Sequence, residues 1–173
     1  MIRLVGTVFL LTASVAAGSF AAESLKKRLK TLKQVRIMLE ALRLMIRYEA
    51  LEVSEIIRRL SENNELSDLG FIEFLQKYSA KCFDDGEMTF DGLWEKAISE
   101  NSGELTAEDI SVISRTGRIL GSCDSDGQLC ALTGLCDETD RLISEAREQY
   151  IAKGKLYRAL GAVAGAFIAI MLV

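Results

Sequence analysis

Each end of the chain carries a run of residues without a charge, and these two runs constrain the fold more than any other feature. The first run, residues 4–22, contains nineteen residues. A helix of that length spans about 28 Å, close to the ~30 Å hydrocarbon core of a bilayer. The second run, residues 159–173, becomes long enough if it begins at Leu156 and Arg158 reaches the interface. We therefore expect a transmembrane helix at residues 1–22 and another at residues 156–173.

Each run also has a simpler interpretation. Residues 4–22 could be a secretory signal peptide, and residues 159–173 could be a buried core helix. Basic residues argue against export, because they flank the inner side of both runs. They are Lys26, Lys27, Arg28, Lys30, Lys33 and Arg36 after the first run, and Lys153, Lys155 and Arg158 before or within the second. The positive-inside rule then predicts a cell-membrane protein with residues 23–155 in the cytosol and both termini outside.

Small residues four positions apart recur in both runs. Such rows let helix backbones approach closely within lipid, where apolar burial gives no driving force. The alternative is simple abundance, because glycine and alanine are common in membrane helices. The candidates for packing between the two membrane helices are Gly18, Gly161 and Gly165.

The chain contains neither proline nor histidine. Proline is excluded from helix interiors but common in loops, so its absence favours long helices with few loops. The absence of histidine removes the commonest general base and metal ligand. The four cysteines match neither zinc-finger nor redox spacing, and no Gly-rich phosphate loop is present. We therefore expect a protein that is not an enzyme, binds no cofactor or metal and, with a net charge of −4, binds no nucleic acid.

A seven-residue apolar repeat follows the first run. It predicts a long amphipathic helix, and its break at Arg36 favours packing within one domain over a coiled coil. The repeat consists of Leu25, Leu32, Leu39, Ile46 and Val53, with Leu29, Val35 and Leu42 between them. Further helices are expected at about 54–63, 67–81 and 90–100, from a Thr106–Asp109 capping box to about residue 121, and from about residue 126 into the second run. The predicted fold is all-α, a cytosolic bundle of five to six helices between two transmembrane helices.

Acidic residues gather before the capping box. From Asp84 to Asp109 there are nine carboxylates and a single base, Lys96. One interpretation is a solvated edge far from the membrane. The functional interpretation is a face that docks a basic partner. Its candidate residues are Asp85, Glu87, Asp91 and Glu95.

Local motifs resemble those of the stage III sporulation protein AB family along the whole chain. The segment 113–128 resembles the family signature fG-x-x-LG-x-x-D-x-x-x-Q, Trp94 fits its W-E-x-x-(L/I) helix, and residues 155–165 are similar to its K-x-x-x-x-LG-x-x-x-G anchor. The signature positions are Gly117, Leu120, Gly121, Asp124 and Gln128. Two glycines one turn apart allow close helix approach or helix termination, and Asp124 is placed to cap the next helix. One departure is Leu51-Glu52-Val53, where the family often has Thr-Pro-Leu, so no proline marks the end of the first long helix.

The resemblance implies a role in endospore formation, within a complex of the mother-cell membrane that builds a channel to the forespore. The family's cytosolic domain is similar to the inner-membrane platform of type II secretion and type IV pilus machines. By that analogy the chain is a non-enzymatic platform. Its implied partners are the lipid bilayer, other membrane components of the channel, and the cytosolic secretion-type ATPase of its own operon. The alternative is a self-associating membrane scaffold without an ATPase partner.

Overall fold

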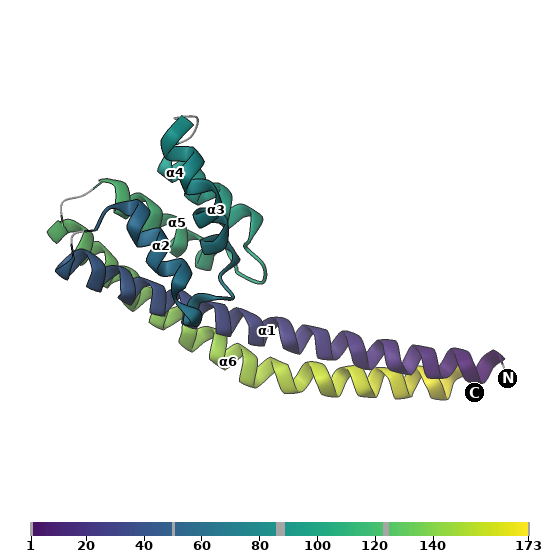
Figure 1. The fold of residues 1–173 in the computed structure, drawn as a ribbon. Coiled ribbons are helices and arrows are strands. Elements are labelled where there is room, and N and C mark those ends of the chain that lie inside the picture. The colour runs from purple at the N-terminus through teal and green to yellow at the C-terminus, as the bar shows by residue number, and fades with distance from the viewer. Residues whose placement is uncertain (1, 50, 86–88, 123–124, 173) are drawn as a thin grey trace. The chain divides into compact units, whose positions relative to one another are not determined.

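The computed structural model describes residues 2–49, 51–85, 89–122 and 125–172. In these ranges it contains six α-helices, one short 3-10 helix and no strand (Figure 1). The helices are α1 (Ile2–Tyr48), α2 (Val53–Glu62), η1 (Asn64–Leu66), α3 (Gly70–Asp85), α4 (Phe90–Glu100), α5 (Ala107–Ser122) and α6 (Ser125–Leu172). The prediction of an all-α fold is confirmed.

The chain divides into two compact units. The end unit consists of Met1–Leu29 and Ser144–Val173, and the central unit is Lys30–Ile143. Helices α1 and α6 contribute to both units, whereas α2 to α5 belong to the central unit. Each unit is described by itself below.

The core of the central unit contains the part of the predicted apolar repeat that runs from Leu32 to Ile46, whereas Leu25 and Leu29 belong to the end unit. Leu32, Val35, Leu39 and Leu42 are each at most 1% exposed, so the repeat packs inside a domain, as its break at Arg36 indicated. Helices α2, α3, α4 and α5 pack successively, each on its neighbour in the chain. The largest fully buried side chain is that of Trp94 on α4.

Helix α1 ends at Tyr48 although no proline follows it. Glu52 has an extended backbone, with φ −66° and ψ 152°, and α2 begins at the next residue. Arg59 of α2 forms an ion pair with Glu49 just beyond α1. Val53 therefore belongs to α2 and does not continue the repeat of α1, which corrects the last position of that pattern.

The predicted capping box at the start of α5 is confirmed. The backbone N–H of Thr106 donates to the Asp109 carboxylate at 2.8 Å, and the N–H of Asp109 donates to the Thr106 hydroxyl oxygen at 3.4 Å. Reciprocal bonds of this kind satisfy two N–H groups that a helix start otherwise leaves unpaired. Helix α6 runs without a break from Ser125 to Leu172, as predicted.

The end unit pairs the first part of α1 with the last part of α6 in antiparallel directions (Figure 1). Ala22 is buried, and Arg28, only 7% exposed, donates from Nη1 to the Gln149 side-chain oxygen at 3.1 Å. Large apolar side chains face outward here, including Phe20 at 71% exposure and Val163 at 64%.

Within the ranges that the structure describes, no helix combines the length and the apolar character needed to cross a membrane. The structure thus does not support the transmembrane helices predicted at residues 1–22 and 156–173. That prediction rests largely on apolar residues whose side chains the structure does not describe, including residues 4–11 and 164–172. The same holds for Gly161 and Gly165, whereas Gly18 is described and partly buried.

Candidate partner-binding surfaces and the signature residues

Trp94 of α4 and Gly117 of α5 lie in close contact. A Cβ atom added to Gly117 would lie 2.5 Å from Cγ and Cδ1 of the Trp94 indole. No side chain fits in that space, so the approach of α5 to the indole of α4 requires glycine. The indole Nε1–H donates to the backbone oxygen of Ile113 at 2.8 Å, and Trp94 is 1% exposed. Phe71 meets the indole edge-on, with ring centroids 5.9 Å apart.

Gln128 closes the end of α5. Its side-chain Nε2 donates to the backbone oxygens of Ile119 and Leu120, at 3.1 and 3.3 Å. Carbonyl groups in the last turn of a helix have no partner within the helix, so this side chain satisfies two of them. The side chain of Leu120 is buried, and α5 ends at Ser122, next to the predicted stop at Gly121.

Trp94, Gly117, Leu120 and Gln128 thus all make contacts inside the fold. Asp124 lies outside the described residues, and its predicted capping role with it. The arrangement links α4, α5 and the start of α6 through packing and backbone hydrogen bonds. In chemical terms it positions helices and presents no reactive group.

Two thiols are described, and they differ in environment. Cys130 on α6 is exposed, whereas Cys136, further along the same helix, is buried. Burial raises the pKa of the Cys136 thiol, against the opposing effect of the nearby Arg36 and Arg43 guanidinium groups. A thiol with a raised pKa is a poor nucleophile at neutral pH. The side chains of the other two cysteines, Cys82 and Cys123, lie outside those described.

The acidic edge is only partly described. Asp91 and Glu95 lie one turn apart on α4 and are both exposed, which suits the predicted docking role. The side chain of Asp85 and the whole of Glu87 lie outside the described part of the chain.

Two of the nine carboxylates between Asp84 and Asp109 do not belong to an acidic docking face. Asp109 is fully buried in the capping box, and Glu108 forms an ion pair with Arg141 of α6. A run of carboxylates in a sequence does not distinguish solvated residues from those with a partner in the fold, and here the last two have partners. The docking candidates on α4 are unaffected by this correction.

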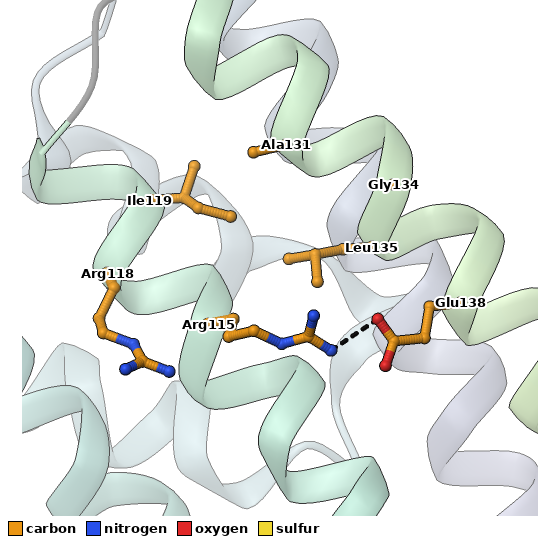
Figure 2. Close-up of a pocket in the computed structure, with 7 residues that line it drawn as sticks. All are labelled: Arg115, Arg118, Ile119, Ala131, Gly134, Leu135 and Glu138. Atoms are coloured by element: carbon orange, nitrogen blue, oxygen red, sulfur yellow. Dashed lines mark hydrogen bonds and ion pairs between the residues drawn. The ribbon is translucent and has the colours of Figure 1, made fainter.

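A pocket of about 450 Å³ lies between α5 and α6 of the central unit (Figure 2). Arg115 donates from Nη2 to the Glu138 carboxylate at 2.6 Å across it, and Arg118 lies on the same wall, one turn along α5 (Figure 2). The sequence interpretation missed this pocket. The sequence features that could have indicated the pocket are a pair of arginines three residues apart and a glycine in the middle of a long helix. Only the packing of α5 and α6 brings these residues together.

A family model described as stage III sporulation protein AB matches residues 3–173 of the chain. The match covers nearly the whole sequence and includes the positions on which the resemblance was based. No curated protein and no solved structure matches the chain.

Proposed function

Because the chain belongs to the stage III sporulation protein AB family and is thus a sporulation protein, we propose that it is a non-enzymatic assembly platform of a sporulation channel. The observation that carries the proposal is the family match over residues 3–173. The described signature residues add to it, because they maintain the fold and leave the surface of the central unit for partners.

In this proposal the end unit anchors the chain in the mother-cell membrane and the central unit faces the cytosol. The support is the uncharged run at each end and the basic residues that flank both runs on the inner side. Outward-facing Phe20, Leu156 and Leu160, each more than half exposed, suit an apolar environment better than water.

The proposed partner is the secretion-type ATPase of the same operon, and α4 provides the docking face. The exposed carboxylates Asp91 and Glu95 would meet basic side chains of the ATPase. Complementary charges of this kind accelerate association and select the partner. Asp85 and Glu87 extend the same acidic segment in the sequence.

The second candidate function is a self-associating scaffold without an ATPase partner. It is favoured by small residues of the end unit that stay exposed in one copy, Ala13 and Ala17. Close packing at such positions would join copies of the chain.

A direct binding measurement separates these functions. The full chain, purified in a mild detergent, is immobilised and titrated with the purified ATPase. The platform function predicts saturable binding that weakens with salt, and a Kd that rises at least about tenfold in the Asp91→Lys/Glu95→Lys variant.

The matched control is Glu73→Lys/Asp137→Lys, which changes the net charge equally at two other exposed carboxylates. Its Kd should stay near that of the wild type. Trp94 emission verifies that each variant is folded, because the indole is buried only in the folded protein. Absence of any binding by the wild type would contradict the platform function and favour the scaffold.

A further inference from the structure

Another pocket of the central unit lies where α2, η1 and α3 meet. Its volume is about 330 Å³, at the lower end of the ~300–1,000 Å³ range of small-molecule sites, so it has room for one long side chain. The pocket has an apolar floor and a polar rim. The floor consists of side chains that are each at most 3% exposed, Leu60, Leu66, Leu69 and Ile72, and the rim consists of Ser61, Ser67, Glu73 and Gln76.

The segment that forms this pocket is acidic. Residues 60–76 contain the whole lining, and they carry four carboxylates and neither lysine nor arginine. Two of the four carboxylates, those of Glu62 and Asp68, already form ion pairs within the chain. The carboxylate that lines the pocket is that of Glu73.

Glu73 is exposed and has no ion pair or hydrogen bond to its side chain within the part of the chain that the structure describes. Lys77, one turn further along α3, does not neutralise it, because the Lys77 ammonium lies over the ring of Tyr78, 5.6 Å from the centroid. The lining therefore has one free negative charge and no positive charge, which attracts a cation.

The hydrogen-bonding groups of the rim favour a ligand rich in donors. The Ser61 hydroxyl donates to the backbone oxygen of Arg58 at 2.6 Å, so its oxygen can only accept from a ligand. An ionised carboxylate likewise only accepts, and the Gln76 amide offers a further acceptor. A guanidinium group carries five N–H donors and no acceptor, on an aliphatic stem that suits an apolar floor. An arginine side chain thus matches the floor and the rim, and the compact ammonium of lysine matches the acceptors less completely.

The lining also indicates that this arginine belongs to a protein. Free arginine carries a carboxylate, for which the lining offers no base, whereas a residue within a protein chain carries none. A second copy of this chain is a poor source. Every arginine whose side chain the structure describes already has a partner in the fold, with the exception of Arg147.

We propose that the pocket between α2, η1 and α3 binds an arginine side chain of a different protein. The aliphatic stem lies on the leucine and isoleucine floor, and the guanidinium donates to the Glu73 carboxylate and the Ser61 hydroxyl oxygen. The pocket shares no residue with the acidic face of α4, so it does not depend on the ATPase of the proposed function. Glu73→Lys should abolish arginine binding here and leave ATPase binding unchanged, so either proposal can fail alone.

The first experiment measures the ligand chemistry. The full chain in a nonionic detergent is titrated with N-acetyl-argininamide, whose flanking amides imitate a peptide, and saturation-transfer NMR gives the Kd. The neutral isostere N-acetyl-citrullinamide should bind at least about fivefold more weakly, because a charge-assisted hydrogen bond is roughly twice as strong as a neutral one. Free arginine should also bind more weakly. Tighter binding of free arginine than of the capped probe would assign the pocket to a metabolite and overturn the proposal.

The matched variants are Glu73→Gln and Glu100→Gln, which remove one exposed carboxylate inside and outside the pocket, respectively. Glu73→Gln should raise the Kd of the arginine probe about fivefold or more and change that of the citrulline probe little. Glu100→Gln should bind both probes as the wild type does, and Trp94 emission verifies folding. Equal binding of the two probes by the wild type, or an arginine Kd that Glu73→Gln leaves unchanged, would contradict the proposal.

The second experiment identifies the source of the arginine. Photoreactive benzoylphenylalanine replaces the exposed Lys77 in the full chain, and sporulating cells are irradiated. We expect an adduct with a protein other than this chain, which is reduced in Glu73→Gln and unchanged in Arg147→Gln. An adduct between two copies that is lost in Arg147→Gln would assign the pocket to a second copy and overturn the proposal, as would an adduct that does not depend on Glu73.

Discussion

The end unit and the central unit use the same two helices in opposite ways. In the central unit α1 buries one apolar face, with Leu39 and Leu42 fully covered, while Leu44 lies outside that face and is half exposed. Its charged residues form ion pairs such as Arg36 to Asp140 at 3.1 Å. In the end unit the large side chains of Phe20 and Leu160 face outward. The same helix thus buries large apolar side chains along one part of its length and exposes them along another. The two units therefore differ in whether α1 and α6 bury their large apolar side chains.

The two units also differ in what an added Cβ atom would meet at a glycine, a facing helix in the central unit and a side chain of the same helix in the end unit. In the central unit an added Cβ at Gly117 would overlap the Trp94 ring. In the end unit an added Cβ at Gly154 would lie 3.5 Å from the ring of Tyr150, which is an ordinary van der Waals distance. The packing of the central unit therefore requires a glycine at position 117. The packing of the end unit does not require one at position 154.

The largest predicted effect comes from exchanging these two glycines for alanine. Gly117→Ala should lower the free energy of unfolding by about 1–3 kcal/mol, because the indole and α5 must move apart. Gly154→Ala should leave it unchanged or raise it by up to about 1 kcal/mol through better helix propensity. Denaturant titration of the full chain, followed by Trp94 emission, measures both. Equal midpoints would show that the contact between α4 and α5 is not a constraint on the fold.

A smaller effect is expected at the end of α5. Gln128→Ala removes the two hydrogen bonds to the last-turn oxygens, and should cost about 0.5–1.5 kcal/mol of unfolding free energy. Gln76→Ala, at an exposed glutamine of α3, is the matched control and should stay within about 0.5 kcal/mol of the wild type. If both variants unfold at the same denaturant concentration, Gln128 does not stabilise the α5 terminus.

The smallest effect concerns an exposed charge on the central unit. Asp68 forms a 2.6 Å ion pair with Lys30 and accepts a 2.9 Å hydrogen bond from the Gln34 amide. The Lys30 ammonium, followed by the Gln34 bond, lowers the pKa of Asp68 below its ordinary value of 3.8. Its contribution is therefore present above pH 3.8 and is lost as pH falls through the lowered pKa.

Asp68→Asn should make stability less dependent on pH in that acid range and change little at pH 7, since exposed pairs contribute little. Unfolding free energies at a series of pH values test this. A steeper loss of stability in acid for the variant than for the wild type would contradict the assignment.

The sequence predicted what local patterns determine. The capping box at Thr106 and Asp109 follows from two residue types three apart, and the burial of Leu32 and Leu39 from a seven-residue period. The unbroken α6 follows from the absence of proline. These features depend on residues that are close together in the chain, so they can be predicted from a single sequence.

Features that depend on distant neighbours were not predictable in the same way. The fit of Trp94 to Gly117 and the pocket at Gly134 arise only when α5 packs on α4 and α6. The pairing of Glu108 with Arg141 likewise joins segments 33 residues apart. The end of α1 at Tyr48 was likewise not predicted, because no proline follows it in the sequence.

The central claim is that the two units lie in different environments, the central unit in the cytosol and the end unit in the membrane. Cys130 tests it, because this thiol is exposed on the central unit. In a variant that retains Cys130 and replaces the other three cysteines with alanine, a membrane-impermeant maleimide is added to intact sporulating cells, with a permeant one in parallel. We expect labelling by the permeant reagent alone, and by both after detergent. Labelling of Cys130 by the impermeant reagent in intact cells would place the central unit outside the cytosol and contradict both the topology and the docking of a cytosolic ATPase.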